Sequence, residues 1–444
     1  MGVGLKRQKT NRIDALVDEL LVEILCRLPC HKTATLCKLV CKRWGSLVSD
    51  PFFMSRFVTI KACQSVTPCA YEDGVSMYDD RRMAMMKDRT MGFVVRKGHR
   101  NTRKGFMIHL NDPIYSPKNL SCSRLPRFVN KGLPPNLTVV ATCNDLTLYQ
   151  RHGDKQYFKK FEFYICNSQT KQWLALPPLT HDYRSRNIGL ICDPYYTFDG
   201  NRLTTNDAYQ ACVVFLIYKS GSHSKFSAYL LSPTTGGLWR TVVLSLPIRC
   251  KLVYPCHFHP IGRKLYFNTR RYLFGFDPFV DVSNGTSKEK DIIIRCDSIP
   301  MPRGLMCGAA LYGVFHDKLY TCDRLDEGRY RVWVLEDYVT GKWSLRHSIA
   351  GQDWIPRDHR LAELVNTRPV FGSVIGFHPA NPDAIYVLSE RWIVLCNLPT
   401  KEMDIAFALP KSCWDLFPCF DSFDIRLPVW PTPLPILVQG DYHQ

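Results

Sequence analysis

The stretch LVDELLVEILCRLP, residues 16–29, constrains the start of this chain more than any other part of the sequence. On a helical wheel its charged residues fall on one side and its apolar residues share one arc. That arc consists of Leu20, Leu21, Ile24, Leu25 and Leu28. The run is shorter than the roughly 20 apolar residues of a membrane-spanning helix, and Pro29 ends it. The stretch therefore predicts a short amphipathic helix and not a membrane anchor.

Residues 30–53 predict two further short helices. Apolar residues recur at helical spacing around Leu39 and again around Leu47, and Ser49-Asp50-Pro51 is a helix stop. Between residues 16 and 53, 21 of 38 residues are apolar. A unit this small cannot bury so many apolar side chains by itself. We expect some of them to contact another protein or, alternatively, the rest of the same chain.

The order of residues in this region strongly resembles the F-box, the adaptor-binding module of SCF-type (Skp–cullin–F-box) ubiquitin ligases. The usual pattern runs Leu-Leu, Glu-Ile-Leu, Arg-Leu-Pro, Val-Cys-Lys, Trp and Ser-Asp-Pro before an aromatic residue. All of these elements occur here in that order, between Leu20 and Phe52. The sequence departs from the pattern at Val17, where proline is usual, and at Ala34 and Thr35, where larger apolar residues are common.

The resemblance implies a three-helix F-box over residues 13–57. It also implies that this module docks on a Skp-type adaptor and, through the adaptor, on a cullin–RING ligase. The residues expected to contact the adaptor are Leu16, Val17, Leu20, Leu21, Ile24, Leu25, Leu28, Pro29, Val40, Cys41 and Trp44. The sequence does not separate those that contact the adaptor from those that hold the helices together.

Beyond Phe57 short apolar runs alternate with turns rich in Gly, Pro, Asn and Asp, which predicts an all-β region. A strand followed by a polar turn with Thr and then Trp recurs at residues 164–173, 229–239 and 333–343, and more weakly at 394–403. A second phrase, Phe-His before a turn and a strand, begins at Phe258, Phe315 and Phe377, at intervals of 57 and 62 residues. Two phrases with one period predict a β-propeller of six blades, with seven as the alternative.

These repeats resemble the degenerate kelch-type repeats of plant F-box-associated domains. The resemblance rests on ATCNDLTLYQ at residues 141–150 and on the Asn-x-x-Thr-Lys-x-Trp turn at residues 167–173. It covers most of residues 100–405, although the paired glycines of kelch repeats occur only at Gly236-Gly237. We expect the recurring Trp and Phe residues to pack the blades, with ligand platforms as the alternative. The fold class is thus α+β and multidomain, with a short helical F-box before an all-β propeller.

The expected domain boundaries follow from these patterns. Residues 1–12 are a basic tail expected to be disordered, 13–57 the F-box, 58–105 a basic connector and the start of the propeller, and 106–426 the F-box-associated propeller. Residues 427–444 are proline-rich. This last segment packs along the ring or closes it, or it serves as an extended recognition segment.

The chain carries a formal net charge of +18, and its densest basic run is RKGHRNTRK at residues 96–104. We expect a solvated loop there, with the binding of an acidic partner surface as the alternative. Aromatic residues barely interleave with the run, so a nucleic-acid partner is not expected. The candidate substrate-binding residues are Arg96, Lys97, Arg100, Arg103 and Lys104.

Signals of catalysis or metal binding are weak. SPTTGGLW at residues 232–239 has the spacing of a sialidase Asp-box, but Thr234 replaces the aspartate and the motif occurs once. Cys250, Cys256, His257 and His259 lack the usual zinc spacing, so packing is favoured over a zinc site. Neither a dinucleotide-binding nor a P-loop motif occurs. We therefore expect no catalytic residue, no metal and no cofactor.

Nineteen cysteines without an apolar N-terminal leader indicate reduced thiols in the cytoplasm, the nucleus or both, and no membrane partner. The sequence and its resemblance together predict a non-catalytic subunit that recruits an unidentified protein substrate for ubiquitination. In that interpretation the propeller holds the substrate. The alternative is an adaptor-docked scaffold or ligand-binding propeller that delivers no substrate.

Overall fold

The computed structural model describes residues 13, 15–65 and most of 90–435. Outside the described residues lie 1–12, 14, 66–89, 98–104, 112–119, 125–136, 152–161, 168, 180–186, 194–195, 200–201, 206–209, 218–224, 232–238, 251–257, 280–291, 306–310, 316–317, 326–327, 368–371, 379–380, 390, 410–419, 426–429 and 436–444. The chain divides into two compact units. The first contains the described parts of Met1–Asp88, Tyr195–Asp207 and Pro428–Trp430, and the second contains the described remainder.

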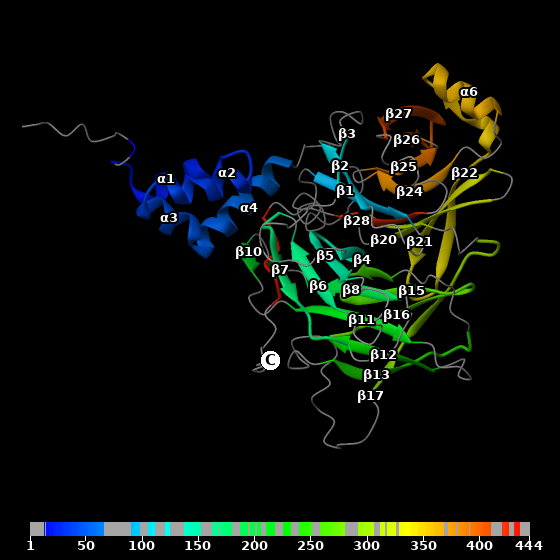
Figure 1. Ribbon diagram of the computed structural model, residues 1–444, viewed down its shortest axis with the longest axis horizontal. Coiled ribbons are helices and arrows are strands. Elements are labelled where there is room, and N and C mark those ends of the chain that lie inside the picture. Colours follow the sequence, from blue (N-terminus) through cyan, green and yellow to red (C-terminus); the bar gives the residue numbers. More distant parts are fainter. Residues whose placement is uncertain are drawn as a thin grey trace, which may run out of the picture. The chain divides into compact units, whose positions relative to one another are not determined.

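The first unit is built from helices, drawn in blue in Figure 1. They are α1 (Asp18–Cys26), α2 (His31–Leu36), the 3-10 turn η1 (Cys37–Leu39), α3 (Lys42–Ser49) and α4 (Pro51–Ser65). A hairpin of β9 (Tyr196–Asp199) and β10 (Arg202–Thr205) belongs to the same unit. The core of the helices is apolar, with Leu21, Leu25, Phe53 and Phe57 almost completely buried. The helical character expected of residues 16–53 is thus confirmed, although a further helix, α4, begins within that range at Pro51.

The Ser49-Asp50-Pro51 stop also starts a helix. Asp50 Oδ1 accepts a hydrogen bond from the Phe52 N–H at 2.8 Å, which satisfies one of the free donors at the start of α4. Pro51 occupies the first helical position, where a missing N–H costs little. As a result α4 runs on to Ser65, past residue 57, where the sequence placed the end of the F-box and the start of a connector. The same three residues thus end one helix and begin the next.

The second unit contains a propeller whose blades follow one another along the chain (Figure 1). The first blade is β4 (Leu137–Cys143), β5 (Leu146–Arg151), β6 (Phe163–Asn167) and β7 (Gln172–Ala175). The second is β8 (Ile188–Cys192), β11 (Ala211–Ile217), β12 (Lys225–Leu231) and β13 (Arg240–Ser245), with β17 (Ile292–Arg295) added parallel to β13. The third is β14 (Phe258–Ile261), β15 (Lys264–Asn268), β16 (Tyr272–Phe276) and β18 (Asp297–Pro300).

The fourth blade is β19 (Leu311–Phe315), β20 (Lys318–Arg324), β21 (Tyr330–Asp337) and β22 (Lys342–Ile349). The fifth is β24 (Ser373–His378), β25 (Asn381–Ser389), β26 (Trp392–Asn397) and β27 (Glu402–Ala408), with β23 (Ile355–Pro356) added parallel to β27. Between these two blades lie the 3-10 turn η3 (Gly351–Asp353) and the helix α6 (His359–Thr367).

A further sheet joins strands from both ends of this unit. In it β28 (Phe420–Ile425) pairs with β1 (Thr90–Lys97), which is followed by β2 (Gly105–Asn111) and β3 (Leu120–Arg124). The structure describes the backbone pairing of this sheet but not the burial of its side chains. Counted over the sheets whose side chains are described, the propeller has five blades, not the six or seven expected. The expected number of blades came from dividing the length of the chain by the repeat period. It was too high because part of the chain forms additions that are not blades, such as β9–β10, β17, β23 and α6.

The recurring strand–turn phrase is confirmed as one repeated turn at three of its four places, and residues 232–238 of the fourth lie outside the described residues. In three blades the Oδ1 atom of an Asn or Asp accepts a hydrogen bond from a backbone N–H two or three residues later, at 2.8–3.2 Å. These residues are Asn167, Asp337 and Asn397, and the residue four positions after each has a positive φ, namely Lys171, Gly341 and Lys401. The turns therefore share both their side-chain bond and their backbone shape.

The recurring aromatic residues pack the blades, as predicted, and several of them do so between neighbouring blades. Trp239 Nε1 donates to the Pro177 carbonyl at 2.7 Å, and Trp343 Nε1 donates to the Pro300 carbonyl at 2.9 Å. In both cases the acceptor comes from the end of the preceding blade. The rings of Phe315 and Phe377 lie 5.7 Å apart across the fourth and fifth blades. These contacts explain why the repeats keep Trp and Phe at fixed positions.

The start of the proline-rich segment packs on the first blade, one of the roles expected for it. The Thr432 N–H donates to Asp145 Oδ2 at 2.9 Å, and the Thr432 carbonyl accepts from Asn167 Nδ2 at 2.7 Å. Asp145 is fully buried, and this desolvation raises the pKa of its carboxyl. Leu434 adds an apolar contact with the same blade.

Candidate protein-binding site

The helical unit exposes a concentration of large apolar side chains. Of the twelve exposed large apolar residues among the described part of the chain, eight lie between residues 13 and 52. They are Ile13, Val17, Leu20, Ile24, Leu36, Leu39, Val40 and Phe52, each with at least half of its surface exposed. A patch of this kind is typical of a protein–protein interaction site.

Helix α1 divides its leucine-rich arc into two stripes. Leu20 and Ile24, four residues apart, are 54% and 51% exposed. Leu21 and Leu25, the next pair at the same spacing, are 1% and 2% exposed and pack in the helical core. Because successive helical residues are rotated by about 100°, adjacent leucines face different surroundings. Leu21 and Leu25 therefore hold the helices together, the role that the sequence left open for some of the predicted residues, and their contact with the adaptor stays a prediction.

The remaining predicted contact residues fall into two groups. Val17 and Val40 are exposed, as are Pro29 and Cys41, whereas Leu16, Leu28 and Trp44 are half-buried. Both Leu28 and Trp44 pack partly against the helical core. The prediction missed four exposed residues, which are Ile13, Leu36, Leu39 and Phe52. The apolar stripe through Leu39 and the aromatic that ends the motif were visible in the sequence and could have revealed three of them.

Ion pairs fix the helices around the exposed face. Glu23 of α1 accepts from Arg56 Nε of α4 at 2.6 Å and from Arg27 Nη1 at 3.2 Å. The bond from Arg56 is the main cause that holds the pKa of Glu23 below its ordinary value. Asp18 of α1 pairs with Arg43 of α3 at 2.6 Å. These pairs link α1 to both α3 and α4, so that the exposed residues of α1 have defined positions.

One cysteine of this unit, Cys26, is a packing group. Cys26 is fully buried, and burial raises the pKa of its thiol to about 12. A thiol of this kind stays protonated near neutral pH, so it is a poor nucleophile and a poor metal ligand. All cysteines in the described residues are free.

The basic run predicted to bind substrate lies mostly outside the described residues. Arg96 and Lys97 end β1, where Arg96 is in register with Gly105 and Asp421. The backbone there is a strand and not the loop that was expected. Arg100, Arg103 and Lys104 lie outside the described residues. The substrate-binding role of this run stays a prediction.

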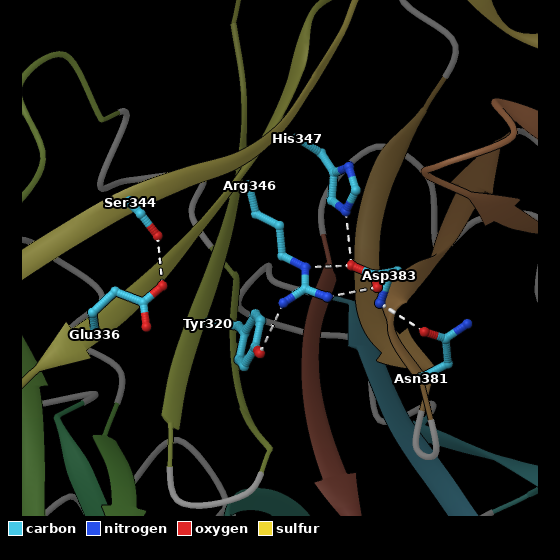
Figure 2. Close-up of polar contacts among 7 residues, drawn as sticks. All are labelled: Tyr320, Glu336, Ser344, Arg346, His347, Asn381 and Asp383. Atoms are coloured by element: carbon cyan, nitrogen blue, oxygen red, sulfur yellow. Dashed lines mark hydrogen bonds and ion pairs between the residues drawn. The ribbon is translucent and has the colours of Figure 1, made fainter. Parts of the chain in front are cut away.

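A polar network links the fourth and fifth blades (Figure 2). Arg346 of β22 donates from Nε and Nη2 to the two carboxylate oxygens of Asp383 at 2.5 and 2.7 Å, and His347 Nε2 lies 2.7 Å from the same carboxylate. Burial opposes ionisation of Asp383, but these bonds outweigh it and hold the pKa of the carboxyl below its ordinary value. Because two neighbouring side chains share this carboxylate, the network holds the blades together and does not provide a free base.

The structure gives no support to a metal site within its described residues. No three His, Cys, Asp or Glu side chains gather there as ligands. His259, the described histidine of the candidate cluster, stacks on Tyr312 of the next blade with ring centroids 4.3 Å apart. Cys250 packs against the core of the second and third blades. Packing thus accounts for both residues.

Among the described residues, every helix is too short or too polar to cross a membrane.

The helical module and the propeller define a two-part protein with an exposed protein-binding face on its helices. Residues 13–56 match the family model of the F-box domain. The chain therefore carries an F-box domain, followed by a β-propeller-like domain. F-box domains bind Skp-type adaptors of cullin–RING ligases, which gives the exposed helical face its expected partner.

No curated protein matches the chain. Solved structures match only distantly. A Bacteroides fragilis protein described as a proposed 6-phosphogluconolactonase is 12% identical with a TM-score of 0.32, covering 78% of this chain and 97% of its own. A prolyl endopeptidase is 11% identical with a TM-score of 0.31, and the match covers 82% of this chain and 54% of that one. An acylaminoacyl peptidase from Pyrococcus horikoshii is 7% identical with a TM-score of 0.29, and the match covers 73% of this chain and 45% of that one. The chain spans about half the length of these two peptidases. Similarities this distant support no inference about activity.

Proposed function

We propose that this protein is the substrate-recognition subunit of an SCF-type ubiquitin ligase. In this role the exposed face of α1, η1 and the start of α4 binds a Skp-type adaptor, and the propeller binds a target protein. The subunit is non-catalytic. Its contribution is to raise the local concentration of the target beside the ubiquitin-charged conjugating enzyme and to orient it there.

One observation carries the proposal. The residues of the F-box match, about a tenth of the chain, hold two thirds of the exposed large apolar residues in the described part of the protein. Such exposure costs free energy in water unless a partner covers it. An F-box adaptor is the partner that accounts for both the sequence motif and the exposed surface.

The construction of the propeller supports its proposed role in binding a target protein. Its strands and turns are fixed by repeated contacts, whereas connecting loops can vary without loss of the fold. We propose that it is related to the degenerate kelch-type propellers of plant F-box proteins, on the strength of the repeated Asn/Asp turns. Function in the cytoplasm or nucleus is part of the same proposal.

The second candidate is a scaffold or ligand-binding propeller that docks on the adaptor but delivers no substrate. Proximity labelling of the full chain under proteasome inhibition separates the two. A ligase receptor requires that labelled partners accumulate with ubiquitin attached, and that this accumulation is lost when the F-box face is mutated. Partners that are labelled but never ubiquitinated would favour the scaffold.

A further inference from the structure

The helical unit contains an aromatic residue from the far end of the chain. Trp430 belongs to this compact unit and packs against α4. Its ring meets those of Phe53 and Phe57 edge-on, with centroid distances of 6.3 and 5.6 Å and interplanar angles of 72° and 71°. It also meets the His31 ring edge-on, with the ring centroids 6.3 Å apart. Trp430 thus bridges α4 and the first residue of α2.

The short helix α2 depends on its neighbours to stay in place. It has six residues, below the length at which a helix is stable by itself. Its N-cap residue, Cys30, makes no side-chain cap bond, and Ala34 is its one buried residue. Ala34 buries little apolar area. The bridge through Trp430 is one of the contacts that tie α2 to α4.

The position of α2 matters for the exposed face. Leu36 ends α2, and Leu39 and Val40 follow within the 3-10 turn and its cap. All three are exposed, at 63%, 82% and 62%. Movement of α2 would displace these residues relative to Leu20 and Ile24 on α1. A binding surface displaced by an ångström or more loses the complementarity on which its affinity depends.

We propose that Trp430 is a positioning residue for the adaptor-binding face. It is a core residue of the F-box unit that the C-terminal segment supplies, and it holds α2 in the arrangement that the adaptor recognises. The adaptor part of this inference rests on the proposed function. Residues 13–56, which match the F-box family, are then incomplete as a folding unit. Removal of the chain beyond residue 427 should therefore impair the F-box, although all the residues of the match are still present.

The test uses the full-length chain with Trp430→Ala, the conservative variant Trp430→Phe, and Trp343→Ala as a matched tryptophan control in the propeller. Amide hydrogen exchange is measured over α2, α4 and β4–β27, and the affinity for a purified Skp-type adaptor is measured by calorimetry. For Trp430→Ala we expect at least tenfold faster exchange in α2 and the first half of α4, unchanged exchange in the propeller strands, and at least tenfold weaker adaptor binding. Trp430→Phe should restore most of both, and Trp343→Ala should leave α2 and α4 unchanged.

The outcomes separate the two proposals. Unchanged exchange in α2 and α4 with Trp430→Ala overturns the positioning role, whether or not the adaptor binds. Faster exchange with unchanged adaptor affinity also overturns it, because the residue would then be structural only. A third outcome is faster exchange in α2 and α4 of Trp430→Ala together with no adaptor binding by the wild-type chain. It would show that Trp430 holds α2 in place but that the proposed function is wrong.

Discussion

Replacement of Leu20 and Ile24 by alanine should weaken adaptor binding without unfolding the protein. The two side chains are 54% and 51% exposed, so about half of each is available for burial by a partner. Truncation to Ala removes three carbons from each, and at about 0.8 kcal/mol per buried carbon this half-share amounts to about 1.2 kcal/mol per residue. The pair then contributes about 2–3 kcal/mol, which corresponds to roughly 50-fold in Kd.

The assay is calorimetric titration of the full-length double variant with a purified Skp-type adaptor, with thermal unfolding measured in parallel. Leu345→Ala is the matched control, because Leu345 is 45% exposed on the propeller and should leave Kd unchanged. The double variant should keep the wild-type Tm within about 2 °C, since little buried area is lost. Undiminished affinity in a folded double variant would refute the assignment of this face.

Three further predictions concern the fold. Leu21→Ala should lower the free energy of unfolding of the helical unit by about 3–5 kcal/mol, measured by chemical denaturation, because Leu21 is 1% exposed; a loss of less than 1 kcal/mol would show that its burial is not structural. Gly313→Ala should destabilise the propeller by about 1–3 kcal/mol, because the added Cβ would lie 2.6 Å from Phe377 Cδ2; an unchanged Tm would contradict this contact. Asp383→Asn should lower stability near pH 7, and its difference from the wild type should shrink as pH falls below about 4, because the pKa of Asp383 is lower when folded than the ordinary value. A difference that stays constant down to pH 2 would show that the carboxylate is not stabilised by its partners.

The sequence revealed the F-box because its residues are determined locally, by helical spacing and by stop signals. It could not divide the leucines of α1, since Leu20 and Leu21 differ only in which neighbour each meets after folding. The same limit explains Trp430, whose partners Phe53 and Phe57 lie far away in the sequence. No local pattern indicates such a contact.

The propeller was predicted from turns that repeat the same chemistry, as Asn167, Asp337 and Asn397 show. The number of blades was not, because β17 and β23 extend existing sheets as parallel strands instead of forming blades. Parallel additions leave no hairpin signal in the sequence. The sequence therefore identified the repeating unit of the propeller, but it did not show which residues lie outside the blades, and so it did not give the number of blades.

The central claim is that the exposed apolar face of the F-box helices binds a Skp-type adaptor. Amide hydrogen exchange of the full chain with and without a purified adaptor tests it most directly. The account predicts a stoichiometric complex with added protection over residues 16–28 and 36–41. A complex that protects only propeller strands, or no complex at micromolar concentration, would contradict it.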